Sequence, residues 1–427
     1  MFKYPIHAAT RLTMTMFLAA ALIAPLEAQP GAARKSGPPH RNAVTYWNEV
    51  ATDALGTEEG TNPMAHSRIL GILHASVHDA LNAIERRFEP YTAGVDAAPG
   101  ASADAAVAAA SRDVLVALFP NQASFVEQAY ASALASIPEG TAKSAGIALG
   151  QAAAAANIAR RQNDGSETAS QPVYVPLPGP GEYQFTVPFN FAAQPGWGRV
   201  EPFVIDLKEH ELEGPQRLTS LQYALDFAQA KAIGHIASRI RTAEQSEIAR
   251  FWYEDSTLGW NRIANTAVRL RQLNAWDAAR TLALVNFAMA DGFIAGFEAK
   301  YRFRFWRPET AIPAAGTDGN PFTQPEATWR PFLITPPVPD YPSTHTVLGW
   351  AAAEVLIDVL GDRLRYSATS LTLPGVTRAY RGFSQAAEEN GMSRIYAGIH
   401  FVHAVKEGRR QGRGIGRAVA EALPPVY

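Results

Sequence analysis

Apolar residues recur three and four positions apart along much of the chain, which is the spacing of a helix with one buried face. The clearest case lies between residues 66 and 85, where the apolar positions are Leu70, Leu73, Val77, Leu81 and Ile84. A helix is also predicted to begin near Val44. Three Ala-rich helices should follow, over residues 101–118, about 122–137 and about 141–162, with breaks at Pro120, Pro138 and Gly165.

The helical pattern stops between residues 166 and 214. Pro and Gly are frequent there, and aromatic residues are spread through the segment: Tyr174, Tyr183, Phe185, Phe189, Phe191 and Trp197. The segment is too long for an ordinary connection between helices. We interpret it as an arm that packs across the helices. A cover over a functional site and a contact with a partner chain are the alternatives.

Helical spacing resumes near Leu218 and continues to the C-terminus. Thr242 and Gln245 have the spacing of a capping box, and a long apolar helix is predicted from about Asp277 towards Lys300. The pattern therefore predicts an all-α fold of helical bundles joined by a long irregular aromatic connection. The expected units are an N-terminal helical bundle (42–165), the irregular connection (166–214) and a C-terminal helical domain with the active site (215–427).

The N-terminus has the features of a secretory signal peptide over residues 1–28. Lys3 and Arg11 are basic, the run from residue 12 to residue 24 is mostly apolar, and a cleavage site follows Ala28. Residues 29–41 are rich in Pro, Gly and basic residues and are predicted to be a disordered lead. We expect an exported protein, periplasmic or extracellular. An uncleaved N-terminal anchor is the alternative.

Composition narrows the classes of partner. The chain has 427 residues, of which 47% are hydrophobic, so it can bury a sizeable core. The net charge of −2 gives no electrostatic reason to expect nucleic acid as a partner. The chain has no Cys, so packing rather than disulfides must stabilise it. We expect no later stretch long and apolar enough to cross a bilayer, and hence a protein that does not span a membrane.

Candidate chemistry gathers in three segments of the last third, each beside a helix-breaking signal. The segments are 300–308, 342–345 and 393–400. They contain three cations, one hydroxyl and two imidazoles: Lys300, Arg307, Arg394, Ser343, His345 and His400. Such a set can hold a highly charged oxyanion and carry out acid–base or nucleophilic chemistry on it.

Two of the singled-out features also have a purely structural interpretation. Ser343 is a natural N-cap, but a helix N-terminus also offers free N–H groups to an anion, and the two other segments favour that functional role. His74 and His78 have the i, i+4 spacing of metal ligands. No third ligand is evident near them, so we interpret both as structural histidines.

The three segments resemble the signature of the vanadium-dependent haloperoxidases and of the acid phosphatases that share their fold, the type 2 phosphatidic acid phosphatase superfamily. That signature is Lys, six residues, Arg-Pro; then Pro-Ser-Gly-His; then Ser-Arg, five residues, His. The sequence matches it in order and internal spacing over residues 300–400. A looser resemblance to exported bacterial haloperoxidase-like proteins begins at Tyr46.

The resemblance implies a vanadate-dependent peroxidase that oxidises halide with hydrogen peroxide to hypohalous acid. It implies vanadate as the cofactor, with phosphate able to occupy the same site, and a small-molecule substrate. It also allows a homo-oligomer. His400 would be the single protein ligand of the metal, and His345 the acid–base group. The implied contacts to the oxygen atoms of vanadate come from Lys300, Arg307, Ser343, Thr344 and Arg394.

Two positions depart from the family pattern. Thr344 stands where the family usually has Gly, and its backbone N–H can still face an oxyanion. Ala404 stands where the family often has an Asp that would orient the ligand imidazole from its far nitrogen. The candidates to replace that Asp are His403, Glu407 and the pair Glu388-Glu389.

Two other functions remain open. An exported acid phosphatase would form a phosphohistidine at His400, and His345 would protonate the leaving alcohol. A non-catalytic oxyanion-binding protein is suggested by Ala404. The long N-terminal helical half resembles the haloperoxidase-like proteins more than the compact acid phosphatases, which favours the peroxidase.

Overall fold

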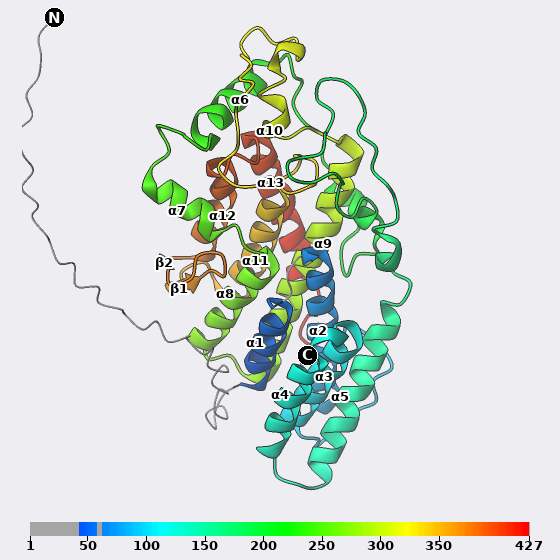
Figure 1. Ribbon diagram of the computed structural model, residues 1–427. Coiled ribbons are helices and arrows are strands. Elements are labelled where there is room, and N and C mark those ends of the chain that lie inside the picture. The colour runs from blue at the N-terminus through cyan, green and yellow to red at the C-terminus, as the bar shows by residue number, and fades with distance from the viewer. Residues whose placement is uncertain (1–41, 58–61, 427) are drawn as a thin grey trace, which may run out of the picture. The chain divides into compact units, whose positions relative to one another are not determined.

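The computed structural model describes residues 42–57 and 62–426. These residues fold into thirteen α-helices, five short 3₁₀ turns and one antiparallel hairpin of two strands (Figure 1). The all-α prediction is therefore confirmed, with the hairpin as the one strand pair that the pattern did not predict among these residues. The predicted signal peptide (1–28) and lead (29–41) lie outside the described residues, and export stays a prediction.

Five helices form the first part of the described chain. They are α1 (Ala43–Leu55), α2 (Pro63–Ile84), α3 (Ala103–Leu118), α4 (Ala123–Ala135, after the 3₁₀ turn η1, Pro120–Gln122) and α5 (Thr141–Arg160). Asn42, Asn62 and Ser102 begin the first three by accepting backbone N–H groups in their side chains. Helices α3 and α5 pack closely, because a Cβ on Gly150 would lie 2.2 Å from the carbonyl oxygen of Ala106.

The segment 166–214 contains three short 3₁₀ turns among its described residues: η2 (Ser166–Thr168), η3 (Trp197–Arg199) and η4 (Leu207–His210). Its backbone is tied to the second half of the chain. Tyr183 N donates to Arg304 O at 2.7 Å, and Ala193 N donates to Pro337 O at 2.8 Å. The buried Trp197 joins the main core. The segment thus packs as an arm, in agreement with the preferred interpretation.

The remaining elements follow a second run of helical spacing. They are α6 (Leu221–Gly234), α7 (Ala243–Phe251), α8 (Ser256–Leu270), α9 (Ala275–Phe303), α10 (Pro308–Ala311), η5 (Ala315–Thr317), α11 (Thr344–Leu360), β1 (Tyr366–Thr369), β2 (Thr377–Tyr380), α12 (Phe383–Tyr396) and α13 (Val402–Ala420). The hairpin pairs Tyr366 with Tyr380. The predicted capping box of Thr242 and Gln245 is present in both directions.

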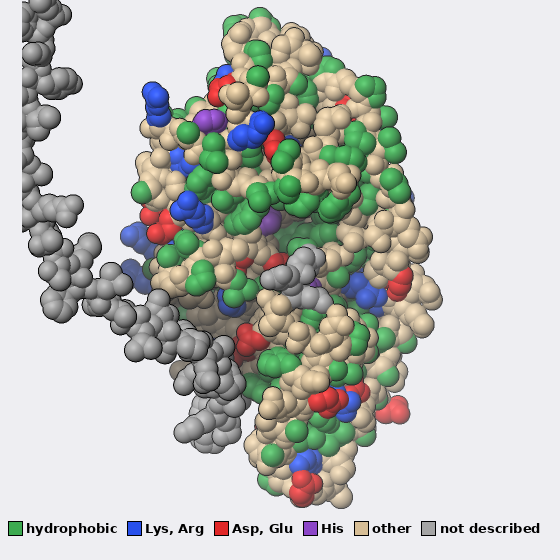
Figure 2. All heavy atoms as spheres, in the orientation of Figure 1, with side chains coloured by type: hydrophobic (Ala, Val, Ile, Leu, Met, Phe, Trp, Pro, Cys, Tyr) green, Lys and Arg blue, Asp and Glu red, His purple; other side chains and the backbone are tan. Residues whose placement is uncertain are grey.

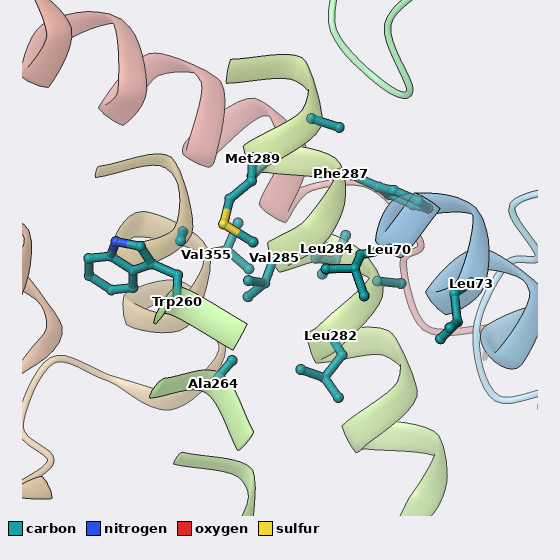
Figure 3. Packing of buried hydrophobic residues seen from close by; sticks show 14 of the residues in the cluster. Leu70, Leu73, Trp260, Ala264, Leu282, Leu284, Val285, Phe287, Met289 and Val355 are labelled. Atoms are coloured by element: carbon teal, nitrogen blue, oxygen red, sulfur yellow. The ribbon is translucent and has the colours of Figure 1, made fainter. Parts of the chain in front are cut away.

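Helix α9 connects the core to the candidate chemistry. It packs against α2, α8, α11 and α13, and Figure 3 shows its Leu284 and Phe287 on the side of α2, with Met289 and Val285 towards Trp260 and Val355. A run of side chains that is almost fully buried leads along this helix to Lys300 in its last turn. Burial of the helix therefore fixes the position of that lysine.

Helix α9 is also the one described helix that is long and apolar enough to cross a membrane. The expectation that no such stretch follows the N-terminus is therefore wrong by length and hydropathy. The reason is that 94% of the apolar window of α9 is buried inside the protein, where a core helix has the same composition as a membrane span.

Candidate active site

The three sequence segments meet at the ends of helices. Helix α9 ends at Phe303, where Arg304 adopts the left-handed conformation (φ 48°), and Arg307 then begins the short helix α10. Ser343 is the N-cap residue of α11, and Arg394 lies in the last turn of α12. The predicted helix that runs towards Lys300 thus ends between Lys300 and Arg307. Pro308 at the first position of α10 is the physical reason.

His400 lies between α12 and α13 and is 3% exposed. The turn before it depends on Gly398 (φ +76°), where a Cβ would lie 2.3 Å from Gly234 O at the end of α6. Arg307 reaches the imidazole: its Nη1 lies 2.8 Å from His400 Nε2 and donates to Ile399 O at 2.6 Å. On the other edge of the ring, Nδ1 lies 2.9 Å from Asp340 Oδ1.

Lys300 is fully buried and holds the loop that precedes α11. Its Nζ donates to Pro339 O at 2.6 Å, to Asp340 O at 3.2 Å and to Pro342 O at 2.6 Å. Burial and the nearby Arg307 lower the pKa of Lys300 well below 10.5. Three carbonyl acceptors nevertheless require the protonated ammonium. Lys300 thus supplies charge to the site while its protons are bound to the main chain.

Arg394 has spare hydrogen-bonding capacity. One N–H donates to Trp252 O at 2.9 Å, and the guanidinium carbon lies 5.6 Å from the ring centre of Tyr253. Its Nε is buried and has no hydrogen-bond partner among the described residues. Burial lowers the pKa of Arg394 to about 9, which leaves the side chain charged at neutral pH.

The N-terminus of α11 faces the same region with free donors. Ser343 is fully buried, yet its side chain makes no capping bond and its Oγ accepts from Thr346 Oγ1 at 3.0 Å. In the described chain the backbone N–H groups of Thr344 and His345 have no acceptor. A helix N-terminus with unpaired N–H groups is a ready site for an anion.

His345 is partly exposed, and its Nε2 lies 3.1 Å from the carbonyl oxygen of Glu254. Because a carbonyl only accepts, Nε2 carries the ring proton and Nδ1 is the nitrogen that can take up another. Burial and the positive charge of Arg394 lower the pKa of His345 well below 6.5. The ring is therefore neutral at pH 7.

The electrostatic balance of the site is positive. The three cations are each at most 1% exposed. Among the described residues, no carboxylate lies within ion-pair distance of Lys300 or Arg394, and only Asp340 approaches Arg307, at 4.0 Å. Burial, then Arg307, Lys300, Arg394 and His345, lower the pKa of His400 well below 6.5. Burial raises the pKa of Asp340 to about 7 against the pull of Arg307 and Lys300.

Asp340 is the site residue that the sequence analysis missed. None of the proposed replacements for the family Asp contacts His400: His403 Nε2 lies 3.3 Å from Gly214 O, Glu407 pairs with Arg410, Glu388 pairs with Arg409 and Glu389 pairs with Arg378. Those expectations are wrong because the four side chains are engaged elsewhere. The available signal was a carboxylate three residues before Ser343 and two residues before the second segment.

Lys300, Arg307 and Arg394 contribute almost nothing to the molecular surface, because each is at most 1% exposed. On the face drawn in Figure 2, hydrophobic side chains gather across the middle with a histidine among them, while Lys and Arg are sparse there. In the described chain no group of three or more His, Cys, Asp or Glu residues could hold a metal ion.

Comparison with known proteins gives matches both to sequences and to solved structures. A family model described as the VCPO second helical-bundle domain matches residues 280–425. The chain is 26% identical to the vanadium chloroperoxidase of Curvularia inaequalis over 484 aligned residues, covering 84% of this chain and 78% of that protein.

Solved structures agree with that result. A bacterial vanadium-dependent iodoperoxidase is similar with a TM-score of 0.78 and 25% identity, covering 92% of this chain and 99% of that one. The holo form of a bacterial vanadium-dependent chloroperoxidase has a TM-score of 0.71 and 16% identity, covering 86% of this chain and 94% of that one. The second likeness concerns the fold.

Proposed function

We propose, from its similarity to the vanadium haloperoxidases, that the chain is a vanadate-dependent peroxidase that oxidises halide with hydrogen peroxide to hypohalous acid. The observation that carries the proposal is the excess of buried positive charge. Lys300, Arg307 and Arg394 are buried with a single carboxylate at the edge of the group. Buried charges need partners, and an oxyanion would supply them.

The donors present fit vanadate. Arg307, Arg394, the Ser343 hydroxyl and the N–H of Thr344 would hold its oxygen atoms, and Lys300 would add charge through the loop that it supports. The unpartnered Nε of Arg394 and the free N–H groups of α11 support this assignment. His400 would be the metal ligand through Nε2. When bound, vanadate supplies Lewis-acid activation of hydrogen peroxide for the oxidation of halide.

His345 would be the acid–base group that transfers the proton of hydrogen peroxide. Its Nε2–H is held by Glu254 O, so Nδ1 is free to accept a proton from hydrogen peroxide and return it to a leaving oxygen. The surrounding cations keep the ring neutral, which is the form that can accept a proton. A small organic substrate, and the homo-oligomer that the resemblance allows, stay predictions.

The test is reconstitution of the full-length apoprotein with vanadate. We expect vanadate to be retained in elemental analysis and to restore oxidation of bromide by hydrogen peroxide. The variant His400→Ala should retain no vanadium and show no turnover, because the single metal ligand is gone. His235→Ala, which removes a histidine outside the site, should behave as wild type. Undiminished turnover in His400→Ala would contradict the proposal.

A second assay separates the alternatives. Hydrolysis of a chromogenic phosphomonoester that is lost in His400→Ala, without peroxidase activity, would favour the acid phosphatase with its phosphohistidine. Binding of vanadate without either activity would favour a non-catalytic oxyanion-binding protein. Because the same buried cations would serve all three, only turnover distinguishes them.

A further inference from the structure

The two nitrogen atoms of the His400 ring have neighbours of opposite kind. Nε2 lies 2.8 Å from Nη1 of Arg307, and Nδ1 lies 2.9 Å from Oδ1 of Asp340. A guanidinium can only donate, so Nε2 must be the bare nitrogen. The proton of the neutral ring is then on Nδ1, beside the carboxylate of Asp340. The two groups are close but not aligned as a hydrogen bond, and among the described residues His400 Nδ1 and both Asp340 carboxylate oxygens are buried without another hydrogen-bond partner. Arg307 thus specifies the tautomer, and Asp340 is the group nearest to the proton.

We propose that Asp340 is the positioning residue of His400, and that it takes over the task of the aspartate that the family pattern has at the position of Ala404. It would hold the Nδ1–H tautomer and fix the plane of the ring, so that the lone pair of Nε2 points at the oxyanion. This inference rests on the proposed function of His400 as the group that binds the oxyanion, and it applies equally to a peroxidase and to a phosphatase.

Asp340 is well suited to a positioning role because the main chain around it is fixed. Its backbone N donates to Phe305 O at 2.8 Å, and its carbonyl accepts from Lys300 Nζ at 3.2 Å. The residue is 1% exposed. The same lysine therefore supplies charge to the site and clamps the loop that carries the carboxylate.

The small side chain of Ala404 leaves space for the carboxylate of Asp340 beside His400. Asp340 and Ala404 line one small cavity, together with Phe401 and Tyr223. The two segments are tied there by a hydrogen bond from Ser343 N to Ala404 O at 2.9 Å. The carboxylate thus reaches the ring from the loop before α11 instead of from α13. A carboxylate placed at 404 would enter the cavity that Asp340 already borders.

The experiment compares Asp340→Ala, Ala404→Asp and the double variant in the full-length protein. The first measurement is the tautomer of His400 in the apoprotein, read from ¹⁵N chemical shifts of labelled histidine rings. We expect wild type and Ala404→Asp to show Nδ1–H. In Asp340→Ala, Nδ1 loses the neighbouring carboxylate, and a mixture with Nε2–H should appear.

The second measurement is vanadate affinity by calorimetry. Loss of a carboxylate that orients a metal-bound histidine typically costs about 10–100-fold in affinity, and we expect that range for Asp340→Ala. If Asp340→Ala lowers vanadate affinity about a hundredfold, the double variant should bind at least about tenfold more tightly than Asp340→Ala. A purely structural role of Asp340 would not produce this recovery. Ala404→Asp alone should bind as wild type.

The result that would overturn the proposal is an Asp340→Ala protein in which His400 keeps Nδ1–H and wild-type vanadate affinity. A folded double variant that binds no tighter than Asp340→Ala would also overturn it. If wild type bound no vanadate, the proposed function would fail, yet the tautomer of His400 in apo Asp340→Ala would still decide the role of Asp340.

Discussion

Two groups of buried cations in this protein differ in how their charge is balanced. Near the end of α5, Arg68 and Arg161 share the carboxylate of Asp164, at 2.7 Å and 2.9 Å. Burial would raise the pKa of Asp164, but Arg68, Ser166 and Arg161 overcome it and lower the pKa. Arg161 also donates to carbonyl oxygens of the irregular segment. Both cations of this group therefore have a carboxylate partner within the protein.

The second group, Lys300, Arg307 and Arg394, is more deeply buried than Arg68 and has one carboxylate, Asp340, which is shared with His400. Unbalanced buried charge costs stability, and proteins retain it where a ligand supplies the opposite charge. Burial alone thus does not identify a functional cation. The difference between the groups is that both cations of the first pair with a carboxylate, whereas among the described residues Lys300 and Arg394 have none within ion-pair distance.

The largest expected effect tests this difference through stability. Arg161→Met leaves the Asp164 carboxylate with one partner fewer, and breaking such a buried pair should lower the free energy of unfolding by about 3–5 kcal/mol. Arg394→Met removes a charge without a carboxylate partner, so without oxyanion the loss should be under about 1 kcal/mol. Urea unfolding of the two variants measures both. Equal losses would mean that the charge of Arg394 is balanced within the fold.

A smaller effect sharpens the comparison for histidines. Burial lowers the pKa of His74 to about 3, and its Nε2 bonds to Asn48 Oδ1 at 2.9 Å. The folded pKa lies below the unfolded value, so this contribution is present above pH 6.5 and is lost as the pH falls towards 3. Wild type should lose about 2 kcal/mol more than His74→Gln between pH 7 and pH 5.

Urea titrations of wild type and His74→Gln at the two pH values check this expectation. Peroxidase activity at pH 7 should be the same in both, because His74 lies in α2 and has no cation among the causes of its shift. By contrast, the pKa of His400 is lowered first by burial and then by three cations, Arg307, Lys300 and Arg394. Identical pH slopes for the two proteins would contradict the interpretation of His74 as a buried neutral residue.

The last comparison concerns glycines in the two regions. A Cβ on Gly296 would lie 2.7 Å from Thr344 Cγ2, the end of a side chain, whereas a Cβ on Gly150 would meet the backbone of α3. Gly296→Ala should cost about 1–3 kcal/mol by overpacking, and adding Thr344→Gly should relieve most of that strain. A double-mutant cycle by urea unfolding measures the coupling.

Gly150→Ala is the matched control, because no side-chain truncation can move a backbone carbonyl, so Thr344→Gly should not relieve its cost. Thr344→Gly alone should keep vanadate affinity within about threefold, since the N–H that faces the site is retained. A large loss of affinity would show that the Thr344 side chain, rather than its backbone, contacts the oxyanion.

Local patterns allowed much of the fold to be predicted. Helical spacing placed α2 and α9, and the capping box placed the start of α7, because both depend on residues close in sequence. The hairpin β1–β2 was missed because each strand has four residues, too few for a clear alternation. The length and hydropathy of α9 do not by themselves distinguish a buried core helix from a membrane span, and its burial is seen only in the structure.

The sequence by itself determined which residues are candidates for the site, since motif order and spacing single out Lys300, Arg307, Ser343, Arg394 and the two histidines. Only the tertiary structure decided what each can offer. Lys300 has its protons on three carbonyls, Arg394 keeps an unpartnered Nε, and Asp340 rather than a residue near Ala404 meets His400. The physical reason is that pairing of buried charge depends on distances between segments that are far apart along the chain, and no local pattern encodes them.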